Sequence, residues 1–212
     1  MSLALLRFPL VAACLFTLAT PLASAAQPMA PSDDYSFNHA KSIVGFTIYA
    51  KALFTIKREG QFKDFTGDVS YDPLHPNDTH VDLTVYTSSV DMHNTEHEAL
   101  LRSNGFFDVA EFPTMHFVSA GTNTRSDGTF EVTGDLTIRG ITKRMAIPVK
   151  IRPAAGASAT SSPVFETTFD IDRTEFGLNG TPTWGGINVS IAKKVQIHIA
   201  IAAQPGAKPW AR

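Results

Sequence analysis

Apolar and polar residues alternate over residues 130–139, with Gly134 counted on the apolar face. A period of two is typical of a β-strand with one face in a core and the other toward solvent. Gly140 marks a turn, and the alternation returns from Met145 to Ile151, so the two segments predict a β-hairpin. Pro148 lacks a backbone donor and is expected at a sheet edge or a bulge, where an exposed edge would allow a homodimer.

Further segments repeat this pattern along the chain. Their apolar faces fall within residues 44–48, 81–85, 165–171 and 195–201. Many such strands, few helices and turn signals between them predict an all-β domain, either a closed antiparallel barrel or a sandwich. A barrel of about eight strands encloses room for one small ligand.

One short helix is predicted in this β-rich chain. Residues 95–98 have the form of a capping box, with Thr95 as the N-cap and Glu98 reaching back to it. The helix is expected to continue through Arg102 and to end at Gly105. Because a helix of two turns is marginal in water, its leucines must pack against the rest of the fold.

An unusually aromatic segment follows the helix. Phe106 and Phe107 are adjacent, and Phe112 and Phe117 come soon after them. Adjacent residues of a strand face opposite sides, so either one of the pair lies outside or the backbone there is irregular. An irregular aromatic segment after a lid helix predicts the rim of an apolar cavity, which favours a binder of lipid-like molecules over a catalyst of polar chemistry.

The N-terminal residues predict a cleaved signal peptide over residues 1–25. Arg7 supplies the positive charge, an apolar run follows, and Ala23-Ser24-Ala25 has the form of a cleavage site, so export to a bacterial periplasm is expected. Small residues before Cys14 also resemble a lipoprotein cleavage box, which would anchor the chain by a lipid. The apolar run continues past Cys14, however, and the run is too short for stable membrane insertion.

The remaining sequence divides into a leader, one domain and a tail. Residues 26–34 are expected to be flexible, residues 35–202 to form the barrel, and residues 203–212 to be loose. Residues 154–163, rich in Ala and Ser, are interpreted as a mobile hairpin loop. Cys14 is the only cysteine, so a cleaved chain would have neither disulfides nor thiol chemistry. The formal net charge of −2 gives no basic surplus for nucleic acid.

Two polar motifs could carry chemistry. Residues 93–97 spell H-x-x-E-H, the inverted zinc-protease pattern, but the predicted helix begins after His93 and no metal site is expected. Arg173 follows an apolar strand among three acids, where it would either pair with a neighbouring Asp or contact a polar head group at the barrel mouth. Arg102 and His97, on the predicted helix, are further candidates for that contact.

Four blocks of the chain together resemble the YceI family of bacterial periplasmic proteins. They are QFKDFTG at 61–67 with YDP at 71–73, residues 100–117 with FFDV and FP, GDLTIRGITK at 134–143, and DRTEFG at 172–177. The resemblance covers about residues 35–202 and implies an extended, lipocalin-like, eight-stranded antiparallel barrel with a short helix at one end. Two features depart from the family pattern, the Phe37-Asn38 start and the loop at 154–163.

The same resemblance implies a periplasmic carrier protein, not an enzyme, that holds an amphiphilic lipid in an apolar tunnel. The lipid would be a long isoprenoid, such as a polyisoprenoid or an isoprenoid quinone, or another amphiphilic lipid, with no other cofactor. The residues expected to line the tunnel are Phe46, Ile48, Val85, Leu101, Phe106, Phe107, Phe112, Phe117, Leu136 and Phe169.

Two alternatives remain open. A lipocalin-like enzyme acting on a bound lipid would need an acid or base in the cavity, and His116 is the best candidate, although alternation places it opposite Met115 and Phe117. An accessory interaction module for a respiratory or stress-response partner would instead have a filled core.

Overall fold

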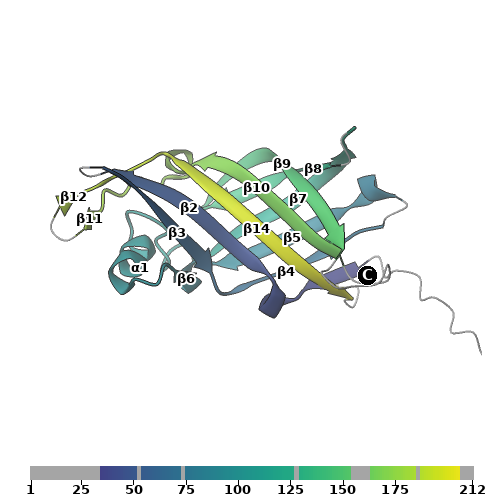
Figure 1. The fold of residues 1–212 in the computed structure, drawn as a ribbon, viewed down its shortest axis with the longest axis horizontal. Coiled ribbons are helices and arrows are strands. Elements are labelled where there is room, and N and C mark those ends of the chain that lie inside the picture. Colours follow the sequence, from purple (N-terminus) through teal and green to yellow (C-terminus); the bar gives the residue numbers. More distant parts are fainter. Residues whose placement is uncertain are drawn as a thin grey trace, which may run out of the picture. The chain divides into compact units, whose positions relative to one another are not determined.

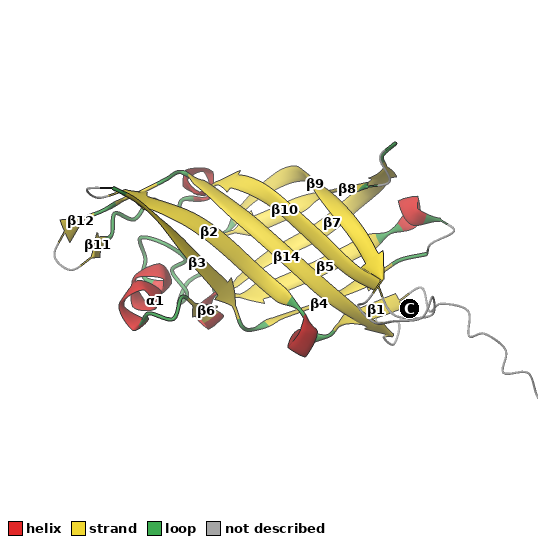
Figure 2. Cartoon of the chain, in the orientation of Figure 1, coloured by secondary structure: helices red, strands yellow, loops and turns green. Residues whose placement is uncertain are grey.

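The computed structural model describes residues 34–51, 54–72, 75–126, 129–153, 163–184 and 187–205. The predicted signal peptide with Cys14, residues 26–33 of the predicted leader, residues 154–162 of the predicted loop and residues 206–212 of the predicted tail lie outside this part of the chain. The described part is built mainly of β-strands, as Figures 1 and 2 show. The main strands are β1 (Asp34–Phe37), β2 (Ile43–Lys51), β3 (Thr55–Phe62), β4 (Phe65–Ser70), β5 (His80–Tyr86), β6 (Val90–Asp91), β7 (Thr114–Thr124), β8 (Phe130–Ile138), β9 (Ile141–Pro153), β10 (Pro163–Asp172) and β14 (Lys194–Pro205).

Shorter elements connect these strands. They are the helix α1 (Thr95–Arg102), the 3-10 turns η1 (His39–Lys41), η2 (Pro76–Asp78), η3 (Thr87–Ser89) and η4 (Arg173–Phe176), and the two-residue strands β11 (Thr183–Trp184), β12 (Ile187–Asn188) and β13 (Ser190–Ile191). β11 and β12 pair with each other, and β13 pairs with the end of β2. In Figure 1, α1 and these short strands lie at one end of the barrel.

The strands close into an antiparallel barrel of eight positions. Three positions are strands interrupted part-way, namely β1 with β2, β3 with β4, and β5 with β6, and the other five are β7, β8, β9, β10 and β14. β14 closes the ring because it pairs with β10 along one edge and with both β1 and β2 along the other. This arrangement confirms the predicted fold class and selects the barrel over the sandwich. Closure gives each of the eight positions a neighbouring strand on both sides, although residues 55–60 of β3 pair only with β2.

The predicted hairpin and strand faces are present in the barrel wall. β8 and β9 pair from Ile138 opposite Ile141 to Phe130 opposite Val149. The pairing of β9 with β10 ends at Val149, and Pro148 is the next residue beyond it. The backbone donor that Pro148 lacks is therefore missing at the end of the β9–β10 ladder. At the other boundary, residues 203–205 continue β14 and pair with β1, so the predicted loose tail begins too early. Asp34, which was predicted to belong to the flexible leader, is the first residue of β1 and pairs with Ser70 on β4.

Two inward-facing glycines allow aromatic rings to lie against the barrel wall. A Cβ at Gly134 would lie 2.4 Å from Cζ of Phe117, and a Cβ at Gly60 would lie 2.4 Å from Cζ of Phe46. Real Cβ atoms do not approach other atoms so closely, so each ring requires the glycine on the neighbouring strand. The glycines therefore fix two aromatic side chains of the interior.

The N-cap of α1 lies one residue earlier than predicted. Asn94, not Thr95, is the N-cap, because its side-chain oxygen accepts from the His97 amide at 2.9 Å. The Glu98 carboxylate accepts from the Asn94 amide at 3.3 Å and also from the Met92 amide at 3.1 Å. The last residue of the helix is Arg102, and Ser103 is the C-cap, so the helix ends before Gly105. Asn and Thr are both favoured N-cap residues, and Asn is the stronger of the two. The sequence therefore allows the helix to be capped by either residue, and the path of the backbone decides between them.

Asp91 stabilises the segment that precedes α1 through an ion pair and hydrogen bonds. Its carboxylate is 9% exposed, pairs with Lys63 at 2.9 Å, and accepts from the Gln61 amide group at 3.2 Å and the His93 backbone amide at 3.1 Å. The bond with Lys63, followed by the His93 amide, holds the pKa of the Asp91 carboxyl well below its usual range. A depressed carboxyl pKa stabilises the fold above the unfolded-state pKa, and that contribution is lost as the pH falls below it.

We therefore expect Asp91→Asn to lower the free energy of unfolding at pH 7 by about 1.5 to 3 kcal/mol, as for other charge-assisted hydrogen bonds. Between pH 5 and pH 2, the wild type should lose stability more steeply than the variant. Urea unfolding at several pH values measures both. Asp135→Asn is the matched control, because Asp135 pairs with Arg144 on the exposed surface and should contribute little. Parallel pH curves for the wild type and Asp91→Asn would contradict this expectation.

Candidate ligand-binding site

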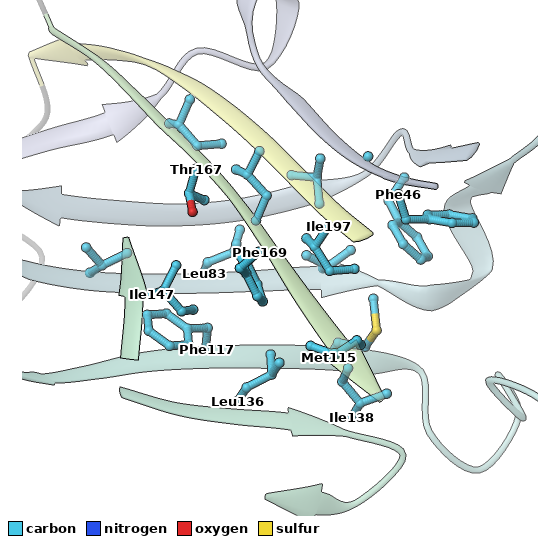
Figure 3. Close-up of a pocket in the computed structure, with 18 of the residues that line it drawn as sticks. Phe46, Leu83, Met115, Phe117, Leu136, Ile138, Ile147, Thr167, Phe169 and Ile197 are labelled. Carbon is cyan, nitrogen blue, oxygen red and sulfur yellow. The ribbon is translucent and has the colours of Figure 1, made fainter. Parts of the chain in front are cut away.

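The barrel encloses an apolar cavity of about 190 Å³. Side chains from every strand position of the ring contribute to its wall, and Figure 3 shows many of them converging on one space. Most are aliphatic or aromatic, because the in-phase residues of each strand point inward. On β8, β10 and β14 these residues are Phe130, Val132, Leu136, Ile138, Phe165, Thr167, Phe169, Ile171, Val195, Ile197, Ile199 and Ile201.

Aromatic side chains gather toward both ends of the barrel. On the side of α1, the ring centroid of Phe62 lies 5.5 Å from that of Phe107 and 5.6 Å from that of Phe46. On the opposite side, the Tyr71 ring packs edge-on against Phe165 with centroids 5.6 Å apart, and burial raises the pKa of its phenol. Large aromatic rings therefore pack against one another toward both ends of the barrel interior.

Nine of the ten residues predicted to line a tunnel are brought together around this cavity. They are Phe46, Ile48, Val85, Leu101, Phe106, Phe107, Phe117, Leu136 and Phe169. Phe112 is placed elsewhere, next to the β8–β9 turn, where Arg139 Cζ lies 5.8 Å from the ring centroid and Gly140 is adjacent. It precedes β7, where the alternation that directs Met115 and Phe117 inward has not yet begun. Phe106 and Phe107 both reach the cavity because their backbone forms an irregular turn.

Arg173 reaches the cavity wall, but its guanidinium is occupied by the backbone. Nε and one terminal nitrogen donate to the carbonyls of Ala192 and Ile191, each at 3.1 Å, and the other donates to Leu178. The side chain is buried, and burial lowers the pKa of the guanidinium from its usual value. Both readings from the sequence therefore need correction: Arg173 neither pairs with a neighbouring Asp through a close contact nor projects a free fork toward a head group. Its hydrogen bonds connect η4 to residues 191 and 192, which precede β14.

The two helix residues proposed for head-group contact lie outside the cavity wall. Arg102 donates to the carbonyls of Ser88 at 2.9 Å and Val90 at 2.7 Å, and it lies 3.7 Å from Glu98. These bonds attach the end of α1 to η3 and β6. His97 lies on the same helix, and burial followed by the nearby charge of Arg58 lowers the pKa of its imidazole.

The residues of the H-x-x-E-H pattern do not adopt the geometry of a zinc-protease site. His93 has a left-handed backbone (φ 53°) and precedes α1, so it does not share a helical face with His97. Within the described ranges, no three His, Cys, Asp or Glu side chains are grouped so that they could hold a metal ion.

His116 and Glu166 border the cavity through their strands, but their side chains make polar pairs elsewhere. His116 Nε2 lies 2.8 Å from Asp82 Oδ1, and both side chains are about 40% exposed. Glu166 pairs with Arg152. The alternation that sends Phe117 and Phe165 inward sends these neighbours outward. His116 is therefore not placed as an acid or base inside the cavity.

Many lining residues escaped the sequence analysis. Leu83, Ile138 and Ile147 follow the alternation of their strands and would have been found had the inward phase been known. Phe62, Leu178 and Ile191 lie near strand ends or in connections, where alternation gives no signal. Thr167 is the most polar of the missed positions that share an apolar face.

The match to a known family rests on nearly the whole barrel. A model of the YceI-like domain matches residues 35–203. The chain belongs to the YceI-like family. This confirms the resemblance derived from the four sequence blocks, and the matched range ends within two residues of the described C-terminus of β14.

Curated relatives and solved structures agree with this assignment. A UPF0312 protein of Ectopseudomonas mendocina (strain ymp) is 38% identical over 91 residues, covering 43% of this chain and 48% of the relative. A UPF0312 protein of Shewanella sp. (strain ANA-3) is 35% identical over 121 residues, covering 57% of this chain and 63% of the relative. The alignments thus span about half to two thirds of these relatives.

Two solved structures share the fold. Burkholderia cenocepacia BcnA has a TM-score of 0.67 and 26% identity, covering 79% of this chain and 99% of BcnA. A polyisoprenoid binding domain from Saccharophagus degradans, implicated in plant cell wall breakdown, has a TM-score of 0.60 and 12% identity, covering 80% and 97% of the two chains. The second likeness shows the fold alone. Among the described helices of this YceI-like protein, none has the length and hydropathy needed to cross a membrane.

Proposed function

We propose that this YceI-like protein binds and carries the apolar chain of an amphiphilic lipid in its barrel, with an isoprenoid chain as the first candidate. The observation that carries the proposal is the apolar cavity of about 190 Å³ inside the closed barrel. An engineered apolar cavity of about 150 Å³ stays dry and binds benzene, so this one is large enough for part of a longer chain. The polyisoprenoid-binding description of the Saccharophagus degradans domain supports the choice of an isoprenoid.

Burial of apolar surface would supply the binding energy. At about 25 cal/mol per Å², roughly 300 Å² of buried chain contributes about 7.5 kcal/mol before the cost of ordering the ligand. The remainder of a long chain would extend toward α1, where Leu101, Phe106 and Phe107 contribute to the cavity wall. Side chains on a short helix and an irregular turn can move more readily than those of a closed ladder.

The alternatives have less support. An enzyme acting on a bound lipid would need an acid or base in the cavity, and the side chains of His116 and Glu166 bind partners elsewhere. An interaction module with a filled core does not require a cavity of this size. The predicted export signal and the periplasmic character of the family support a periplasmic carrier.

Native mass spectrometry of the protein purified from its own periplasm, followed by organic extraction, tests the proposal. A co-purifying lipid of one defined mass is the expected result, and the same spectrum measures whether the protein is a monomer or a homodimer. A mass that matches the protein alone, with no uptake when isoprenoid alcohols are added, would overturn the proposed function.

A further inference from the structure

One polar group in the cavity wall differs from all the others. Thr79 Oγ1 donates to the carbonyl of Pro76 at 2.7 Å, and Thr122 Oγ1 donates to the carbonyl of Thr79 at 3.0 Å. His116, Glu166 and Arg173 hold the partners given above. The Thr167 hydroxyl is buried and has no hydrogen-bond partner among the residues that the structure describes. Thr167 is therefore the exception within the polar part of the wall.

The surroundings of Thr167 are apolar on every side. Along β10 it lies between the inward-facing Phe165 and Phe169. Across the two neighbouring ladders it is opposite Val149 on β9 and Ile199 on β14, and both of these residues also line the cavity. Figure 3 shows Thr167 on the same space as Leu83, Ile147 and Phe169. The Thr167 side chain thus lies on the cavity side of the barrel wall and not on its outer surface.

Threonine is an unfavourable choice at such a position unless the hydroxyl is used. Valine has nearly the same shape and an equal preference for strands, and it buries no polar atom. A buried hydroxyl without a partner loses its hydrogen bonds to water and gains none. Because χ1 rotation moves the oxygen between staggered positions, the same side chain can present it to a molecule in the cavity.

We propose that Thr167 is a hydrogen-bonding anchor for a neutral oxygen, a hydroxyl or a carbonyl, carried by the lipid inside the barrel. The proposal rests on the proposed function and narrows its ligand to apolar chains with an uncharged oxygen group. A hydroxyl both donates and accepts, so it suits either kind of oxygen. An anionic head group buried here would lack a free cation, because Arg173 is the one Lys or Arg among the described lining residues and its guanidinium is committed to three carbonyls.

The experiment compares phytol, a branched isoprenoid alcohol, with phytane, its parent hydrocarbon, by competition against a fluorescent lipid. The variants are Thr167→Val, which removes the hydroxyl, and Thr167→Ser, which keeps it. Thr168→Val is the matched control, because Thr168 is exposed on the outer face of the same strand. We expect the ratio of phytol to phytane affinity to fall about fivefold to tenfold in Thr167→Val, the effect of one hydrogen bond. Thr167→Ser and Thr168→Val should keep the wild-type ratio.

The outcomes separate this inference from the proposed function. If both probes bind but the ratio is the same in Thr167→Val and the wild type, the anchor is wrong and the lipid-binding function stands. If neither probe nor any extracted lipid binds the wild type, both are wrong. Thermal unfolding shows that the variant is folded, since loss of an unpaired buried hydroxyl should leave its Tm equal to or above that of the wild type.

Discussion

Replacement of Arg173 by alanine is expected to destabilise the protein by about 3 to 5 kcal/mol, the largest stability effect among the substitutions considered. The guanidinium is buried and donates to the carbonyls of Leu178, Ile191 and Ala192. Its removal leaves these acceptors without their donor, in a region that also contains the fully buried Phe176. At about 2 to 4 °C per kcal/mol for a domain of this size, the Tm should fall by roughly 6 to 20 °C.

Lysine at the same position separates the structural role from a role in ligand binding. Arg173→Lys keeps the charge, but a single ammonium cannot reproduce a fork that reaches three carbonyls. We expect a loss of about 2 kcal/mol or more from this variant, measured by urea unfolding. If Arg173 instead served a head group, both variants would unfold like the wild type and only lipid affinity would change. That result would restore the interpretation made from the sequence.

Replacement of Ile197 by tryptophan is expected to have the largest effect on binding. Ile197 is the fourth residue of β14, points into the cavity and is only partly buried, so an indole at this position would occupy the space proposed for the lipid. Loss of about 100 to 150 Å² of ligand contact corresponds to roughly 3 kcal/mol, or about a hundredfold weaker affinity. The competition assay with phytol measures this change.

The neighbouring residue provides the control for this substitution. Gln196 precedes Ile197 on β14 and is exposed on the outer face, so Gln196→Trp adds the same side chain without entering the cavity. It should bind phytol like the wild type. Thermal unfolding checks that both variants fold. Wild-type affinity in a folded Ile197→Trp protein would mean that the lipid binds outside the barrel.

Much of the barrel could be predicted from local patterns. The alternation over β8, β9, β10 and β14 predicted strands whose in-phase residues share one face, and these faces line the cavity. Alternation works because successive side chains of a strand must point to opposite sides. The family resemblance added the closed ring and the helix at one end, which alternation by itself left open between a barrel and a sandwich.

Polar residues were harder to place, because their roles depend on partners distant in sequence. Arg173 sits among acids in the chain, yet its donors reach carbonyls 5 to 19 residues away along the chain. Phe112 belongs to the aromatic segment but packs near Arg139 outside the cavity. Thr167 shares an apolar face with Phe165 and Phe169, and nothing in the sequence shows that its hydroxyl lacks a partner.

The strand-rich fold, the short helix and the apolar character of the interior could be predicted from the sequence, because these follow from side-chain periodicity and composition over neighbouring residues. The folded barrel was needed to show which face of each strand is inward, that β14 closes the ring against β1 and β2, and which polar groups have hydrogen-bond partners. Those properties depend on distances between residues far apart in the chain, and the folded backbone alone sets those distances.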